Sequence, residues 1–404
     1  MLYANPRAVR APYPAELRAI MSIERAQESR RWLAAWPGLT PGATPLHELP
    51  ALARRLGVAR MCVKDESLRS RLGSFKALGA SVALVRQVMR LHPGLEPGLV
   101  LSGRYAQLLQ HYTVVSATDG NHGRSLAAAA RDAGCRCAIV LHAQVSLERE
   151  KAIADFGAKI IRVPGNYDAS VREAERLAQA HGWQVISDTS YEGYEDIPRD
   201  VMQGYGTIAA EIAEQTGARA DEAGAFTHVF LQAGVGGMAA GLASYLWELH
   251  GAQRPCFIVV EPAQADCLLQ SAMKGHAAKA TGTVDSVMAG LACGDTSPLA
   301  WRFLAPSVDH FMTIEDDQAV AAMRTLARGG PDIPIVAGES GTAGLAALEV
   351  LRGDCALSAR AGLHPDASVL FINTEGATAP QVYEELVGET AESVQRRQLA
   401  WFAP

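Results

Sequence analysis

Short apolar runs rich in β-branched residues alternate along this chain with longer amphipathic segments. The apolar runs predict strands at 113–118, 135–142, 159–165, 183–188, 227–234, 256–262, 333–340 and 368–376. The amphipathic segments at 146–157, 170–182 and 318–330 have helical spacing, and each ends in glycine, a common helix stop. This alternation predicts an α/β fold of open, twisted, mostly parallel sheets with helices on both faces.

Length and composition are those of a globular protein with two domains. The chain has 404 residues, and 49% of them are hydrophobic, which is enough for a large core. With 20% charged residues and a net charge of -6, we expect no nucleic-acid partner and no anionic membrane partner. Charges recur within the first thirty residues and leave no apolar core for a signal peptide, and no later apolar run could span a bilayer. We therefore expect a cytoplasmic protein.

The seven cysteines form no dense pattern. Cys135 and Cys137 are separated by one residue, not by the two of a zinc knuckle, and we expect no metal site. Cys267 and Cys293 both lie in polar, loop-rich stretches, so a disulfide between them remains open. The expected compartment favours free thiols.

The glycine-rich stretch LQAGVGGMAAG (231–241) follows a predicted strand and opens a helix. Ligands of open sheets bind beyond the carboxyl ends of strands, and glycine backbone N–H groups there can surround a phosphate. Gly234, Gly236 and Ala239 also fit a relaxed dinucleotide fingerprint, with Glu261 at the end of the next strand in the place of a ribose ligand. On this loop alone, a nicotinamide cofactor, another phosphate-bearing ligand and a structural turn all stay open.

Two earlier segments carry further candidate chemistry. In SATDGNHGRSLAAAA (116–130) a predicted strand runs into a turn, where Asp119 and Asn121 are also ordinary turn and capping residues. In GSFKALGA (73–80), Lys76 lies between an aromatic residue and small residues, in an uncharged patch. Partial burial favours the uncharged amine of a lysine, which is a nucleophile toward an aldehyde.

Taken together, these segments resemble the pyridoxal-phosphate enzymes of the tryptophan-synthase-β fold, or fold type II. The shared features are a Ser-x-Lys lysine, a Gly-Asn-His turn and a later glycine-rich phosphate loop, in that order. Within this superfamily the chain is similar to the diaminopropionate ammonia-lyases in ATDGNHG (117–123), IPRDVMQGYGTIAAE (197–211), MAGLACGDTSP (288–298), AGESGTAGLAAL (337–348) and INTEG (372–376). The order of the segments favours this family over a nicotinamide enzyme.

The resemblance implies pyridoxal 5'-phosphate as the cofactor. Lys76 would bind it as an aldimine and act as a base at the α-carbon of the substrate, and Asn121 would bind the phenolic oxygen of the ring. Thr374, or the adjacent Asn373, would lie near the pyridine nitrogen, where a neutral partner disfavours transamination and suits β-elimination. The expected cofactor contacts are Phe75, Lys76, Asn121, Gly234, Val235, Gly236, Gly237, Met238, Gly290, Glu339 and Thr374.

The resemblance further implies elimination of 2,3-diaminopropionate to pyruvate and ammonia through an aminoacrylate, with Thr118, Asp119 and Gly120 contacting the amino-acid substrate. In the serine and threonine dehydratases, the corresponding loop resembles Ser-Ser-Gly-Asn-His and has a hydroxyl group where this chain has the carboxylate of Asp119. This carboxylate could recognise the β-ammonium or act as a second base for the D isomer. The alternatives are a dehydratase of the same fold, a nicotinamide-dependent oxidoreductase and a relative that binds ligand without turnover.

The same fold type implies two domains with the cofactor in the cleft between them. We expect a large domain of residues 1–84 and 196–404 and a small domain of residues 85–195. A homodimer with a role in amino-acid catabolism is implied by the resemblance as well.

Overall fold

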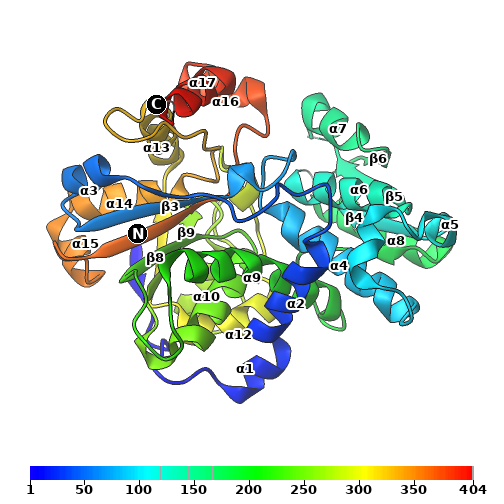
Figure 1. Ribbon diagram of the computed structural model, residues 1–404, viewed down its shortest axis with the longest axis horizontal. Coiled ribbons are helices and arrows are strands. Elements are labelled where there is room, and N and C mark those ends of the chain that lie inside the picture. Colours follow the sequence, from blue (N-terminus) through cyan, green and yellow to red (C-terminus); the bar gives the residue numbers. More distant parts are fainter. Residues whose placement is uncertain (119, 144, 166, 403–404) are drawn as a thin grey trace. The chain divides into compact units, whose positions relative to one another are not determined.

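The computed structural model describes residues 1–118, 120–143, 145–165 and 167–402 (Figure 1). The chain forms two compact units. Unit 1 consists of Met1–Ile23, Ala43–Leu68 and Ile208–Pro404, and unit 2 consists of Glu24–Gly42 and Arg69–Thr207. The segment predicted as the small domain, 85–195, lies inside unit 2.

In the described part of unit 1, seven strands form one sheet in the order β1-β10-β9-β8-β11-β3-β2. The strands are β1 Leu2–Ala4, β2 Leu46–Glu48, β3 Arg60–Asp65, β8 His228–Gln232, β9 Cys256–Pro262, β10 His310–Ile314 and β11 Ser368–Asn373. The central strands pair in parallel, and only the edge strands β1 and β2 pair antiparallel. Parallel neighbours need crossover connections, which helices supply.

Helices cover both faces of this sheet, and Figure 1 shows α14 and α10 on opposite sides of the strands. The helices of unit 1 are α1 Ala15–Ile20, α3 Pro50–Leu56, α10 Gly237–His250, α11 Cys267–Lys274, α12 Pro298–Ser307, α13 Asp316–Arg328, α14 Ala343–Gly353, α15 Cys355–Arg360, α16 Pro380–Val387 and α17 Ala391–Trp401, with single turns η1 Glu66–Leu68, η3 Gly251–Gln253 and η4 Ala289–Leu291. Helix α14 can approach the sheet closely because of Gly344, where a Cβ would lie 2.9 Å from the Cβ of Phe371. Its apolar residues join Phe230 and Phe371 in the main core cluster.

Unit 2 contains a second sheet, of four parallel strands among the described residues, in the order β6-β5-β4-β7. The strands are β4 Thr113–Ala117, β5 Arg136–His142, β6 Lys159–Val163 and β7 Gln184–Val185. The helices are α2 Ile23–Leu33, α4 Lys76–Leu91, α5 Ala106–Leu109, α6 Asn121–Ala133, α7 Leu147–Ala154 and α8 Tyr167–His181, with the turn η2 Pro97–Ser102. Val115 and Val140 of the sheet form a core cluster with Leu177 of α8. Both units therefore have the expected α/β architecture.

The division between the units falls within α9 Asp196–Thr216. At 21 residues, α9 is the longest helix of the described chain. Neither it nor any other described helix combines the length and apolar character needed to cross a membrane.

The prediction of a strand at 333–340 is wrong. The segment is buried, and its side chains alternate between two clusters, with Ile335 in one and Val336 in the other. Its backbone forms no ladder, because Pro334 has no N–H, the N–H of Ile335 donates to Leu326 and that of Gly338 donates to Glu375. The alternation therefore reflects a buried irregular segment that lies between two apolar layers.

A buried ion pair joins β3 to α9 within unit 1. Lys64 Nζ lies 2.7 Å from Glu211 Oε2, and these side chains are 0% and 2% exposed. Lys64 also donates to the carbonyl oxygen of Thr44 at 2.7 Å and to Gln215 Oε1 at 3.0 Å. All three ammonium hydrogens thus have acceptors, which offsets the cost of burying the charge.

Helices α4 and α9 approach closely within unit 2. A Cβ on Gly79 of α4 would lie 2.6 Å from the ring of Tyr205, and a Cβ on Gly204 would lie 2.4 Å from the carbonyl oxygen of Leu78. Tyr205 is 1% exposed, so its ring is enclosed by other residues and cannot turn out into solvent. Glycine at position 79 is therefore required by the close approach of these helices.

Gly79→Ala should lower the free energy of unfolding by about 1–3 kcal/mol, because the new methyl group overlaps the Tyr205 ring. This loss should exceed the gain of about 1 kcal/mol that alanine normally brings to a helix. Urea unfolding measures the change, and Gly98→Ala is the matched control, since a Cβ there has no neighbour within 4 Å. A stabilised Gly79→Ala protein would contradict the packing argument.

Candidate active site

Lys76 is the first residue of α4. Its backbone N–H donates to the hydroxyl of Ser74 at 3.3 Å, and Ala77 and Leu78 behind it are fully buried. The Lys76 side chain is 20% exposed, and Nζ lies 5.4 Å from the centre of the Phe75 ring. The amine is thus held beside an aromatic ring and remains partly accessible.

The Lys76 ammonium forms an ion pair with Asp188, with 2.5 Å between Nζ and Oδ2. Asp188 follows β7, in a segment fixed by the Tyr194 hydroxyl, which accepts from Ser187 N–H and donates to the Val185 carbonyl. Burial opposes a charge on Asp188, but the adjacent Lys76 ammonium outweighs it and holds the pKa of the carboxyl well below its usual range. Asp188 is therefore ionised at neutral pH and orients the amine.

His122 lies in the first turn of α6 and is 4% exposed. Its Nε2 is 2.9 Å from the carbonyl oxygen of Ile186, and its Nδ1 is 3.9 Å from Asp188 Oδ2. Burial is the largest influence on this imidazole and lowers its pKa. His122 is thus packed against the Lys76–Asp188 pair in the neutral form.

The residues expected to contact substrate surround the start of the same helix. Gly120 occupies the N-cap position of α6, and Asn121 is the first helical residue. Thr118 is 8% exposed, and its hydroxyl accepts from the Gly120 N–H at 3.4 Å. Asp119 lies outside the described residues.

The glycine-rich turn connects β8 to α10 in unit 1. Gly236 is the N-cap residue and has a φ of +101°, a backbone conformation that favours glycine. A Cβ on Gly236 would lie 2.9 Å from Leu304 Cδ1, and a Cβ on Gly234 would lie 2.6 Å from Cys293 Sγ. Because Gly236 has no side chain, it cannot cap the helix, and the first N–H groups of α10 are left for an anion.

Gly290 and the segment 338–341 lie against each other in unit 1. The N–H of Gly290, in η4, donates to Ser340 Oγ at 3.0 Å, and a Cβ on Gly290 would lie 2.9 Å from the same oxygen. Ser340 and Glu339 are both buried. The contact with Ser340 therefore leaves little room for a side chain at position 290.

Gln232 ends β8 and organises the end of β11. Its Nε2 lies 2.7 Å from the carbonyl oxygen of Ile372, 3.1 Å from that of Ser340 and 3.2 Å from Thr374 Oγ1. Gln232 is 1% and Thr374 is 3% exposed. The amide has two hydrogens, and the carbonyl oxygens of Ile372 and Ser340 are its two nearest acceptors. Because the amide nitrogen cannot accept a hydrogen bond, the hydroxyl hydrogen of Thr374 is directed elsewhere.

Asn373, the other predicted neighbour of the pyridine nitrogen, has a packing role. Its Nδ2 donates to Asp65 Oδ1 at 2.8 Å and to the carbonyl oxygen of Val336 at 3.0 Å. Both amide hydrogens are thus used within the core, which leaves Thr374 as the better placed of the two residues.

Glu261, the candidate ribose ligand, caps a helix. Its two carboxyl oxygens accept from the backbone N–H groups of Leu268 and Leu269 at 2.7 and 2.8 Å, at the start of α11. It is fully buried, and burial raises its pKa to about 8. With both oxygens occupied, Glu261 is not in a position to bind a ribose, which removes support for the dinucleotide interpretation.

All seven cysteines are free thiols in the structure. Cys267 Sγ lies 3.5 Å from the carbonyl oxygen of Gly234, and Cys293 Sγ is next to the same glycine. The two thiols therefore belong to the surroundings of the glycine turn.

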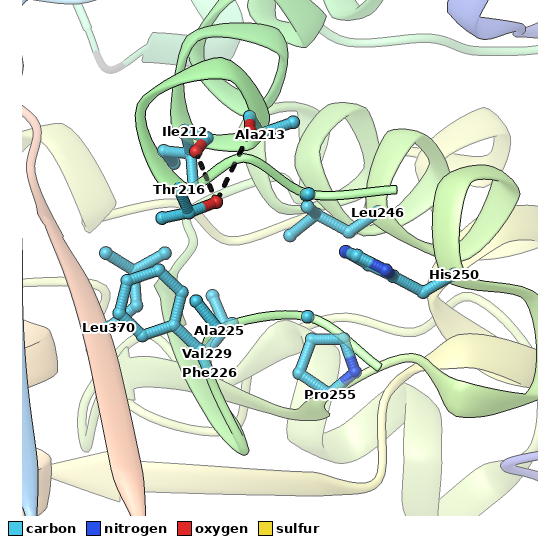
Figure 2. A pocket seen from close by; sticks show the side chains of 12 residues that line it. Ile212, Ala213, Thr216, Ala225, Phe226, Val229, Leu246, His250, Pro255 and Leu370 are labelled. Atoms are coloured by element: carbon cyan, nitrogen blue, oxygen red, sulfur yellow. Dashed lines mark hydrogen bonds between the residues drawn. The ribbon is translucent and has the colours of Figure 1, made fainter. Parts of the chain in front are cut away.

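A small cavity in unit 1, drawn in Figure 2, is separate from these groups. It is lined mainly by apolar side chains, and the hydroxyl of Thr216 is bonded to the carbonyl oxygens of Ile212 and Ala213. Its volume of about 10 Å³ has room for about one water molecule. It is too small for a cofactor.

Residues 38–375 match the family model of pyridoxal-phosphate dependent enzymes. Because this match covers most of the sequence, the chain belongs to the family of pyridoxal-phosphate dependent enzymes.

The chain is more similar in sequence to some members of this family than to others. The diaminopropionate ammonia-lyase of Escherichia coli (strain K12) is 38% identical over 387 residues, which cover 94% of this chain and 95% of that protein. The crystal structure of the holo form of the Escherichia coli enzyme has a TM-score of 0.86 and 37% identity, and the match covers 96% of both chains. The biosynthetic L-threonine dehydratase of Pasteurella multocida is 24% identical, over 86% of this chain and 61% of its own. The expected fold, cofactor and enzyme class, a pyridoxal-phosphate-dependent lyase, are thereby confirmed, whereas the homodimer and the domain limits stay predictions.

The groups present fit this cofactor. The uncapped start of α10 with its glycine turn can bind a phosphate. The hydroxyl of Thr374 can donate a hydrogen bond to a ring nitrogen, and the partly exposed amine of Lys76 can react with an aldehyde. The structure brings the glycine turn, Gly290, Glu339 and Thr374 into unit 1, and it brings Phe75, Lys76, Thr118, Gly120 and Asn121 into unit 2.

Sequence reasoning missed Asp188 and Gln232. Both lie at or near the carboxyl end of a predicted strand, where ligand-binding residues of open sheets are concentrated, so this rule could have singled them out. Their partners are far away in the chain, since Lys76 and Asp188 are 112 residues apart. Tyr205 lies within the segment IPRDVMQGYGTIAAE that carried the resemblance, but its contact with Gly79 has no signal in the sequence.

The raised pKa of Glu261 predicts that part of the stability is lost with increasing pH. A carboxyl group with a folded-state pKa of about 8 and an ordinary value of 4.5 binds more protons in the folded state, so its contribution is full at low pH and declines as the pH rises through about 8. The stability difference between the wild type and Glu261→Gln should fall by about 3 kcal/mol between pH 5.5 and 9. Urea unfolding at both pH values measures it, with the exposed Glu392→Gln as the control, and a constant difference would contradict the buried neutral carboxyl.

Proposed function

We propose that this chain catalyses the α,β-elimination of 2,3-diaminopropionate to pyruvate and ammonia. The observation that carries the proposal is the 38% identity to the Escherichia coli diaminopropionate ammonia-lyase over 94% of the chain, against 24% to the threonine dehydratase. The segment ATDGNHG supports the same choice, because this chain has Asp119 at the position where the loop of the dehydratases has a residue with a hydroxyl group.

Pyridoxal phosphate, when bound, supplies an electron sink that makes the hydrogen on the substrate α-carbon acidic. The backbone N–H groups of residues 234–238 would hold its phosphate, Asn121 its phenolic oxygen and Lys76 its aldehyde carbon. Phe75, Gly290 and Glu339 complete the proposed set of contacts. All these groups are backbone N–H donors or side chains of the described residues, and none requires a metal.

The Thr374 hydroxyl lies beside the amide of Gln232 and would donate to the ring nitrogen. Gln232 Nε2 lies 3.2 Å from Thr374 Oγ1 and is a donor only, so the hydroxyl hydrogen points to a different partner. A ring nitrogen that meets this hydrogen is an acceptor and carries no proton. An unprotonated ring nitrogen disfavours transamination and suits elimination.

Lys76 would remove the α-hydrogen on one face of the substrate, and Asp188 would stabilise the resulting ammonium. The support is the ion pair of 2.5 Å between Lys76 Nζ and Asp188 Oδ2. A proton kept on Lys76 remains beside the substrate, whose β-amino group leaves readily only after it is protonated. In this scheme Lys76 is both the base and the store of the proton that it removes.

Asp119 is proposed as the second base, which acts on the D isomer. Asp119→Asn removes this base but keeps the size of the side chain, so turnover of the L isomer should change by less than about threefold and turnover of the D isomer should fall by about 100-fold or more. Initial rates of pyruvate release from each isomer measure both. Equal losses on the two isomers would contradict this role.

The substrate assignment predicts that the holoenzyme prefers diaminopropionate to hydroxy amino acids. We expect kcat/KM for L- or D-2,3-diaminopropionate to exceed that for L-serine and L-threonine by about 100-fold or more. A site that binds the β-ammonium of diaminopropionate through a charged group leaves this group without an ion-pair partner when the substrate has a hydroxyl instead. Release of α-keto acid from all four compounds is the measurement. Faster turnover of serine or threonine would make the enzyme a dehydratase and would leave Asp119 without the proposed role.

A further inference from the structure

Two basic side chains face the same oxygen of Asp188. Its Oδ2 lies 2.5 Å from Lys76 Nζ and 3.9 Å from His122 Nδ1. The three residues come from α4, from the segment after β7 and from the first turn of α6, all within unit 2. The proposed function uses Lys76 and Asp188 and gives His122 no role.

The hydrogen bond on the far side of the imidazole determines its tautomer. His122 Nε2 lies 2.9 Å from the carbonyl oxygen of Ile186, and a carbonyl can only accept, so Nε2 carries a hydrogen. In the neutral ring Nδ1 is then a bare acceptor. This nitrogen is buried and has no hydrogen-bond partner among the described residues, although it faces a carboxylate.

The charges around His122 explain why it is neutral while Lys76 is charged. Among the described residues, the titratable groups that act on it are Asp188, which favours the imidazolium, and Lys76, which opposes it; Asp119, three positions earlier, lies outside the description. Burial adds to the effect of Lys76 and is the largest of these influences. If Lys76 loses its charge, the opposition ends and an unpaired carboxylate remains beside Nδ1.

We propose that His122 is the reserve proton acceptor of the Lys76–Asp188 pair, and that its Nδ1 binds a proton whenever Lys76 loses its positive charge. The protons balance: Lys76 changes from ammonium to amine by giving up one proton, and Nδ1 gains one. Asp188 therefore keeps one cationic neighbour in both states. The transfer runs through Asp188 Oδ2, which adjoins both bases, and a small rotation of the carboxylate or the imidazole closes the remaining distance.

This inference deepens the proposed function, because Lys76 must lose its charge before its amine can attack an aldehyde. It makes His122 a positioning residue that acts through Asp188. Its first test needs neither substrate nor cofactor, so it can fail or succeed independently of the proposed reaction.

The first test is the pKa of His122, measured by NMR of the histidine rings of the full-length chain across pH. His122→Gln assigns the signal by its disappearance. In Lys76→Met, which removes the charge but keeps the length of the side chain, the pKa of His122 should rise by about one unit or more. Lys159→Met removes an exposed lysine of β6 and should leave it unchanged, and Lys76→Met with Asp188→Asn should cancel the rise. An unchanged or lower pKa in Lys76→Met overturns the proposal.

The second test separates a proton-binding role from a structural one. His122→Gln keeps an N–H donor for the Ile186 carbonyl but cannot bind a proton. We expect kcat of the holoenzyme to fall about tenfold, KM to change less than about threefold and the pH profile of kcat to lose one limb. A pH profile and a kcat equal to those of the wild type would overturn the proposal. A shifted His122 pKa in a protein that does not turn over diaminopropionate would support the proton site and sink only the substrate assignment.

Discussion

Parallel pairing of strands is the constraint on which the candidate site depends. A parallel neighbour is reached only through a crossover, so successive strands finish at the same edge of a sheet, and side chains just beyond them become neighbours. In unit 1 this brings Gln232, at the end of β8, next to Thr374, which follows β11. In unit 2 it brings His122, in the first turn of the helix that follows β4, next to Asp188, which follows β7. The site groups of each unit are thus a product of sheet topology.

The two units contribute different kinds of chemistry. The donors of unit 1 are neutral: the backbone of the glycine turn and the hydroxyl of Thr374, which lies beside the amide of Gln232. The side chains gathered in unit 2 are Lys76, Asp188 and His122, all of which can gain or lose a proton. The groups that can exchange protons are therefore gathered in unit 2, whereas the donors named for unit 1 are not titratable at neutral pH.

The sequence pattern predicted the strands well where a buried apolar segment also pairs with a neighbouring strand. It failed where a buried apolar segment has no such partner. The strands that contain Gln232 and Asn373 could be read from their apolar, β-branched runs. The segment 333–340 has a similar composition because it lies between two apolar layers, but it has no partner strand. Lys76 and the glycine turn could be found because their neighbours in sequence are unusual for their residue types. Asp188 and His122 are ordinary by themselves, and their importance comes from a partner on another element, which a single sequence does not reveal.

The contrast between Lys64 and Lys76 bears on chemical selectivity. Both amines are paired with a carboxylate in the protein, but Lys64 is 0% exposed and its ammonium hydrogens have three acceptors, whereas Lys76 is 20% exposed. Carbonyl compounds form Schiff bases with any accessible amine, so a cofactor with an aldehyde could be lost on the wrong lysine. The buried network around Lys64 keeps its amine permanently out of reach of an aldehyde. Of these two lysines, only Lys76 is accessible to such a compound.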